Sequence, residues 1–295
     1  MGSVKHTEKA KRAWWQRRST KFLMGSLFRP LFGWRDKEQH GVEHFTYVGR
    51  DLSRLSAARK NAKSPRAKAV IVLGHPFLKF GMSYFFKNQY HEQLASAGYH
   101  VVSFNFKGFG SSSVESTNFA DDVASIVDWV RHTFPDLPVY FFGISFGAFH
   151  GMHAIGSGRA RVDAALFDSA PVSLVHFFGK GLLGFVMRSM SRSRWGAITG
   201  THDVFHYLPL PTDLPRLYLF GSKDAFITEQ EKQRLQEHVG KDAVVDFPNC
   251  GHLEIRKAYP EQYFAHVINF FDSHSGVETV ALESSESVGA NLSAA

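Results

Sequence analysis

The stretch Gly143-Ile144-Ser145-Phe146-Gly147 decides the fold, because it places a serine between a strand-like run and a helix-like run. Residues 137–142 before it are apolar and rich in aromatics, and residues 148–154 after it can begin a helix. A tight turn from strand to helix would strain Ser145 and project its hydroxyl from the sheet edge. The flanking glycines would be required because a Cβ there would crowd the neighbouring strand and helix. The same pattern is also typical of a glycine-rich turn with a solvated serine, so its surroundings must decide.

Strand-like and helix-like segments alternate on both sides of this turn. β-Branched runs with few charges, such as 67–73 and 100–106, are typical of strands buried on both faces. Repeated alternation predicts an α/β fold whose twisted, mostly parallel sheet carries helices on both faces. The remaining expected strands are 42–48, 52–59, 137–142, 162–167, 217–220 and 244–247, and the expected helices are 84–97, 119–133 (capped by Asn118), 228–238 and 260–271.

Composition sets broad limits on the class of protein. The chain has 295 residues, 44% of them apolar, which suits one large domain or two small ones. A single cysteine, Cys250, allows no disulfide within the chain. The sequence contains no run of 18 apolar residues, so it predicts no transmembrane helix, and we see no secretory signal. A cytoplasmic location is therefore the default expectation.

The formal charge of +7 is concentrated near the N-terminus, where seven Lys and Arg residues fall within the first 21 residues beside Trp14 and Trp15. A basic, Trp-bearing amphipathic segment is typical of peripheral contact with an anionic membrane surface. A solvated or disordered leader is the alternative. No nucleic-acid-binding motif accompanies the charge, so nucleic acid is not an expected partner.

Ser145 needs a base and an orienting acid to act as a nucleophile. His252 is the best candidate base among 16 histidines, because it follows the last strand at the edge where ligands bind in such sheets. Asp224 is the best candidate acid, in the turn after strand 217–220, although it could instead bond only its own backbone. Asp168, which ends the strand before that, is the rival acid.

The chain order Ser145, Asp224, His252 is similar to that of the α/β-hydrolase superfamily, and the resemblance covers about residues 42–274. It implies an oxyanion hole formed by the backbone N–H groups of Phe77 and Phe146. The chain departs from the family by reading His75-Pro76-Phe77 where relatives read His-Gly-x, so we expect His75 to shape this loop. It also has Asn105 and Lys107 where many relatives have Asp and Arg, in a loop that is usually architectural.

Residues 172–216 form an apolar, glycine-jointed insertion where the superfamily often places a lid, although a small packed helical cap fits equally well. Residues 1–41 would be the basic leader, 42–274 the hydrolase domain and 275–295 a disordered tail. Phe77, Phe80 and Phe109 would make the pocket apolar.

The sequence thus predicts a serine hydrolase, of carboxylesterase, lipase or thioesterase type, acting on a small hydrophobic acyl substrate through an acyl-enzyme. An acyltransferase with the same triad and a non-catalytic scaffold that binds a lipid or a protein are the alternatives. No cofactor is expected. No metal is expected either, because His150 and His153 lack a carboxylate that would complete a ligand set.

Overall fold

The computed structural model describes residues 39, 41–116, 118–173, 185, 189, 204–207, 210–211 and 213–275. Within these residues, one sheet has the strand order β1-β2-β4-β3-β5-β6-β7-β8. β2 is antiparallel to β1 and β4, and every other neighbouring pair is parallel. The strands are β1 (Glu43–Val48), β2 (Arg54–Lys60), β3 (Val70–Gly74), β4 (His100–Phe104), β5 (Val139–Ile144), β6 (Ala164–Asp168), β7 (Arg216–Gly221) and β8 (Val244–Phe247). The predicted mostly parallel sheet is confirmed.

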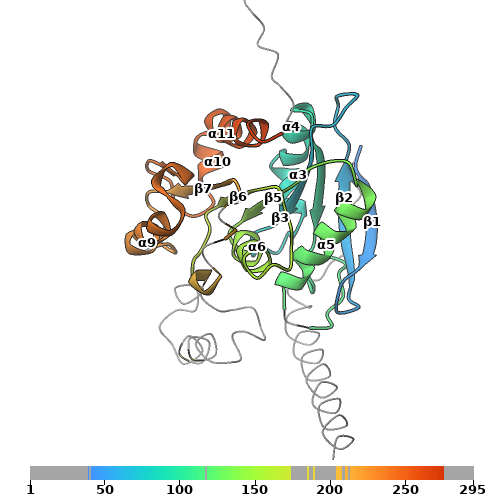
Figure 1. Ribbon diagram of the computed structural model, residues 1–295, viewed down its shortest axis with the longest axis horizontal. Helices are drawn as coiled ribbons and strands as arrows, with labels where there is room; N and C mark the ends of the chain where they lie inside the picture. Colours follow the sequence, from blue (N-terminus) through green and yellow to red (C-terminus); the bar gives the residue numbers. More distant parts are fainter. Residues whose placement is uncertain are drawn as a thin grey trace, which may run out of the picture.

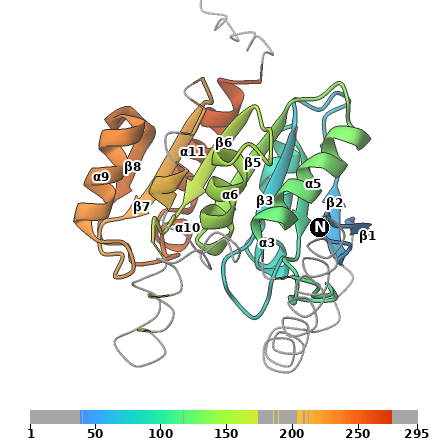
Figure 2. The ribbon, with the colours of Figure 1, turned by 60° about the horizontal axis from the view of Figure 1, so that its bottom comes forward.

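Helices cover both faces of this sheet (Figure 1). One face carries α3 (Ser83–Lys87), α4 (Tyr90–Ser96), α10 (Ile255–Ala258) and α11 (Pro260–Asp272). The other carries α5 (Ala120–Thr133), α6 (Phe146–Gly156) and α9 (Glu229–Val239), which lie in front of the sheet in Figure 2. Two short 3₁₀ turns, Val204–His206 and Lys241–Ala243, complete the described elements.

Strand β5 shows why the sheet forms two separate cores. Val139 and Phe141 pack into the cluster beneath α5 and α6, whereas Tyr140, Phe142 and Ile144 pack beneath α4 and α11. Alternate side chains of a strand point to opposite faces, so a strand covered on both sides must be apolar at every position. All six residues of β5 are buried. The central strand that leads into Ser145 is therefore held rigidly from both sides.

Two local predictions were wrong. The single helix expected over 84–97 is two helices, because Gln89 adopts a φ of 59° between α3 and α4. Asn118 does not cap α5: the helix begins at Ala120, with Phe119 in the cap position and no capping side-chain hydrogen bond. Asn118 contributes only its backbone carbonyl, which accepts from Asp121 N at 3.3 Å.

The expected leader, lid insertion and tail lie almost entirely outside the described residues, so their boundaries stay predictions. Among the residues that are described, no helix is long and apolar enough to cross a membrane.

Candidate active site

The turn at Ser145 connects β5 directly to α6. Ser145 has φ 52° and ψ −108°, a conformation that L-residues with a side chain rarely adopt. A Cβ on Gly147 would lie 2.0 Å from Gly74 O in β3, and one on Gly143 would lie 2.6 Å from Ala148 Cα in α6. Both glycines are therefore required by close approach to the strand and the helix, as their pattern predicted.

Ser145, His252 and Asp224 form a continuous hydrogen-bonded chain. Ser145 Oγ lies 2.8 Å from His252 Nε2, and His252 Nδ1 lies 2.7 Å from Asp224 Oδ2. A carboxylate only accepts, so Nδ1 must carry the imidazole proton and Nε2 is left to accept from the serine hydroxyl. Ser145 is 3% exposed and the Asp224 side chain is fully buried, while 12% of the His252 side chain reaches solvent. The arrangement can move a proton from serine to imidazole.

Asp224 also bonds its own turn, so the contact with the candidate base and the local backbone contact, both considered for it from sequence, occur together. Its Oδ1 accepts from Phe226 N at 2.9 Å, while Oδ2 faces His252. The two carboxylate oxygens therefore have separate partners, which fixes the orientation of the carboxylate relative to the imidazole.

The aspartate and histidine loops are packed against each other by backbone contacts. Lys223 N donates to Cys250 O at 2.8 Å, and Ser222 N donates to Phe247 O at 2.9 Å. A Cβ on Gly221 would lie 2.3 Å from Cys250 O, so only glycine permits this approach. The role of Gly221 was missed from the sequence, because it depends on a loop that lies about 30 residues away.

Asp168, the rival acid, is engaged elsewhere. Its Oδ2 accepts from Tyr263 Oη at 2.6 Å and its Oδ1 accepts from Ser169 Oγ at 2.9 Å. Burial raises the pKa of Asp168 to about 6, against hydrogen bonds from these two hydroxyls that lower it. His252 thus pairs with Asp224, and Asp168 lies behind the site.

The loop after β3 is fixed by His75. The Pro76 carbonyl can only accept, so His75 Nδ1 donates to it at 2.8 Å, and Nε2 accepts from Phe106 N at 3.2 Å. His75 is fully buried and needs its neutral form for both bonds. This agrees with the loop-shaping role expected for it, and it fixes the backbone that precedes Phe77.

The amide of Phe146 is the first in α6, where backbone N–H groups have no acceptor within the helix. The Phe77 and Phe146 rings contact each other with centroids 5.2 Å apart, so the two candidate oxyanion loops meet beside Ser145.

Asn105 and Lys107 hold the loop after β4 in place. Asn105 Oδ1 accepts from Met82 N at 2.8 Å, and the fully buried Lys107 Nζ lies 2.6 Å from Asp51 and 3.1 Å from Asp122. Asn105 and Lys107 differ from the residues usual in the family, but they still form a polar network that holds this loop.

Aromatic rings lie beside the nucleophile turn and against His252. Phe109 lies 5.5 Å from Phe77 between ring centroids, and Phe226 lies edge-on to His252 at 5.0 Å. Phe80, also expected in the pocket, has the Lys87 ammonium 3.6 Å from its ring centroid. Phe226 was missed, although its position two residues after the candidate acid could have drawn attention to it.

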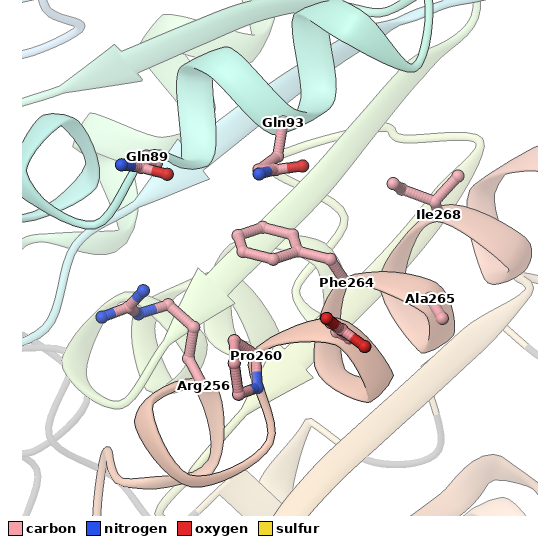
Figure 3. Close-up of a pocket in the computed structure, with 8 residues that line it drawn as sticks. Gln89, Gln93, Arg256, Pro260, Phe264, Ala265 and Ile268 are labelled. Atoms are coloured by element: carbon pink, nitrogen blue, oxygen red, sulfur yellow. The ribbon is translucent and has the colours of Figure 1, made fainter.

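A separate cavity of about 310 Å³ lies away from Ser145, between α4 and the α10–α11 segment. Figure 3 shows the Phe264 ring at its centre, with Gln89 and Gln93 on one side and Arg256 on the other. None of the three triad candidates lines it.

Burial holds the pKa of His150 well below its usual value. In the part of the chain that the structure describes, no group of three or more His, Cys, Asp or Glu side chains could hold a metal ion.

Comparison with known proteins agrees with this geometry. Residues 70–189 match the family model described as alpha/beta hydrolase fold. An esterase of Pyrococcus furiosus superposes with a TM-score of 0.64 at 16% identity, over 83% of this chain and 98% of that one. A carboxyl esterase of Bacillus coagulans gives a TM-score of 0.61 at 10% identity, over 80% and 100%. Together with the strand order, these matches show that the chain has the α/β-hydrolase fold.

Curated relatives match over shorter stretches. The lysophosphatidylserine lipase ABHD12 of Xenopus tropicalis is 38% identical over 61 residues, which are 20% of this chain and 16% of the lipase. The uncharacterized protein RP471 of Rickettsia prowazekii is 27% identical over 153 residues, which are 48% of this chain and 64% of that protein. The chain thus matches less than two thirds of either relative.

Proposed function

We propose that the protein is a serine hydrolase that cleaves an ester or thioester bond of a hydrophobic acyl substrate through an acyl-enzyme. The observation that carries the proposal is the hydrogen-bonded chain from Ser145 through His252 to Asp224, built on the strained turn between β5 and α6. Nucleophile, base and orienting acid in hydrogen-bond contact are the arrangement that activates a serine hydroxyl.

In the first half-reaction, Ser145 Oγ attacks the substrate carbonyl carbon and its proton passes to His252 Nε2. The resulting imidazolium is stabilised by Asp224, which accepts the Nδ1 proton without taking it. When the tetrahedral intermediate collapses, the bond to the leaving oxygen or sulfur breaks and the leaving group takes the proton from Nε2. An ester between the acyl group and Ser145 remains.

The amides of Phe77 and Phe146 would receive the oxyanion. Phe146 N belongs to the first residue of α6, so the positive end of the helix dipole adds to its hydrogen bond. The hydrogen bonds of His75 fix the backbone that precedes Phe77. Donors fixed in advance need no reorganisation during the reaction, which is why such holes contribute strongly to the rate.

In the second half-reaction, His252 Nε2 takes a proton from water, and the hydroxide attacks the acyl carbon. Collapse breaks the bond to Ser145 Oγ, which recovers its proton from His252, and the free acid leaves.

The substrate class is supported by the ring-lined surroundings of the serine, where Phe77, Phe109 and Phe146 pack together and Phe226 contacts His252. Apolar rings favour binding of a hydrophobic acyl chain over binding of a polar substrate group. The short similarity to proteins named as lysophosphatidylserine lipases makes single-chain lipid esters the first substrates to test.

The test uses the full chain with p-nitrophenyl esters, acyl-CoA thioesters and lysophospholipids of graded acyl length. We expect turnover by the wild type that rises with acyl length, and a loss of at least about 10³-fold in kcat for Ser145→Ala. Ser157→Ala is the matched control, because this serine donates to the backbone carbonyls of His153 and Ala154 at the end of α6, away from His252. Transfer to an added alcohol in place of water would indicate the acyltransferase, and lipid binding without any turnover would indicate a non-catalytic scaffold. Either result would contradict the proposal.

A further inference from the structure

The dipeptide Asp168-Ser169, at the end of β6, lies between the nucleophile turn and the histidine loop. The backbone carbonyl of Asp168 accepts from Ser145 N at 2.8 Å. Ser169 Oγ accepts from Leu253 N, the residue after His252, at 3.4 Å. The same hydroxyl donates to Asp168 Oδ1 at 2.9 Å, so one dipeptide connects the two loops that carry nucleophile and base.

Ser169 adopts an unfavourable backbone conformation to make this connection. Its φ is 50°, and Leu253 opposite it has a φ of 64°. Non-glycine residues persist in this region only where surrounding contacts hold them, and such positions concentrate at functional sites. Ser169 N also donates to Leu219 O at 2.9 Å, which holds the dipeptide against the strand that leads to Asp224.

The far side of Asp168 is anchored in the core beneath α4 and α11. Tyr263 uses its only proton to donate to Asp168 Oδ2, so Tyr90 Oη must donate to Tyr263 Oη at 3.1 Å. Tyr90, Tyr263 and Asp168 are all buried, so each hydrogen bond is costly to break. The Asp168 side chain is therefore fixed by two helices that do not contribute to the triad.

We propose that Asp168 and Ser169 are positioning residues that hold the Ser145 turn and the His252 loop at hydrogen-bond distance from each other. The proposal rests on the function proposed above for Ser145 and His252. The Asp168 carboxylate is buried and is not one of the three candidate triad residues. In this proposal its role is to orient the Ser169 hydroxyl toward Leu253.

The charge of Asp168 also acts on the site. Burial raises the pKa of Asp168 to about 6, the charge of His252 lowers it and that of Asp224 raises it. The other titratable groups that face it are Tyr263, Tyr90 and Tyr84. Because the charges of Asp168 and His252 interact, a change that keeps Asp168 neutral should move the acid limb of kcat/KM to lower pH.

The test compares two variants with two matched controls in the full chain. Ser169→Ala removes the bridging hydroxyl, and Tyr263→Phe removes the donor to Asp168. Ser103→Ala and Tyr99→Phe remove a buried serine bonded to His91 and a tyrosine bonded to Asp272, both away from the site. Each protein is assayed for kcat and KM on a p-nitrophenyl ester, for the pH profile of kcat/KM, and for hydrogen exchange of the Leu253 amide.

We expect Ser169→Ala to lower kcat by about 3- to 100-fold with little change in KM, because misplaced groups lose rate more than binding. Exchange of the Leu253 amide should quicken in the same variant. Tyr263→Phe should move the acid limb of the pH profile to lower pH, because Asp168 loses a hydrogen bond that favours its ionised form. Neither control should lower kcat, quicken exchange of the Leu253 amide or move the acid limb of the pH profile.

Hydrogen exchange needs no turnover, so it tests the bridge even if Ser145→Ala proves as active as wild type and the proposed function fails. If Ser169→Ala matches Ser103→Ala in both kcat and Leu253 exchange, the positioning role is wrong. Should Ser169→Ala fail to fold, an unchanged pH profile in Tyr263→Phe would overturn it.

Discussion

Replacing Asp224 with asparagine tests the orientation of His252 most sharply. The amide oxygen and nitrogen must face two donors, since Phe226 N and His252 Nδ1 both donate to the native carboxylate. If the amide oxygen stays on Phe226 N, the amide nitrogen faces Nδ1. The imidazole proton must then move to Nε2, where it blocks acceptance of the Ser145 proton. If the amide flips, the oxygen restores the Nδ1 contact but two N–H groups face each other at Phe226.

The size of the loss follows from the cheaper of these two arrangements. The flip leaves one partly buried donor, Phe226 N, without its acceptor, which costs about 1–3 kcal/mol. Replacing a charged acceptor with a neutral one costs about 1–2 kcal/mol more where the imidazolium forms. The sum of about 2–5 kcal/mol raises the barrier, so kcat for Asp224→Asn should fall about 30- to 5,000-fold.

The assay is steady-state hydrolysis of a p-nitrophenyl ester, with Asp168→Asn measured beside it. The two carboxylate oxygens of Asp168 accept from Tyr263 and Ser169, so its variant should lose less activity than Asp224→Asn. If Asp224→Asn stays within fivefold of the wild type, or Asp168→Asn loses more, the assignment of the orienting acid is refuted.

Two further predictions concern stability. The pKa of Asp168 is raised to about 6 from 3.8, so its contribution is fully present below pH 3.8 and is lost as pH rises through 6. A shift of about two pKa units at 1.36 kcal/mol each corresponds to about 3 kcal/mol. Between pH 4 and pH 8, the free energy of urea unfolding of Asp168→Asn should therefore rise by about 3 kcal/mol relative to that of the wild type. A gap that does not change with pH would contradict this. Lys107→Met leaves Asp51 and Asp122 without their buried partner, so the free energy of unfolding should fall by about 3–5 kcal/mol. Arg50→Met breaks only an exposed pair with Asp128 and should cost less than about 1 kcal/mol; equal losses would contradict the argument.

The sheet was predictable from the sequence because burial on both faces produces apolar strand patterns that need no tertiary information. The runs that became β3 and β5 carry no polar side chain other than the Tyr140 hydroxyl, β4 has an apolar majority, and β8 falls on the predicted residues. The break at Gln89 was not predictable, because neither proline nor glycine marks it and only the positive φ of that residue separates the helices. Asn118 is a residue type that favours the N-cap position, yet Phe119 occupies that position in α5.

The candidate site was likewise predictable from the sequence only in part. The proximity of Ser145, Asp224 and His252 could be predicted because each follows a strand, and the carboxyl ends of parallel strands meet at one edge. The contacts of Gly221 with Cys250, and of Ser169 with Leu253, join loops that are about 30 and 84 residues apart. No local pattern encodes such contacts, so the elements that hold the triad together emerge only from the folded chain.

We propose above that Ser145 is a nucleophile activated by His252. The most direct measurement is the intact mass of the full chain after treatment with a fluorophosphonate, followed by peptide mapping of the adduct. We expect one adduct on Ser145 in the wild type, no adduct in Ser145→Ala, and labelling of His252→Ala slowed by at least about 10³-fold. An adduct on another residue, or labelling of His252→Ala at the wild-type rate, would contradict it.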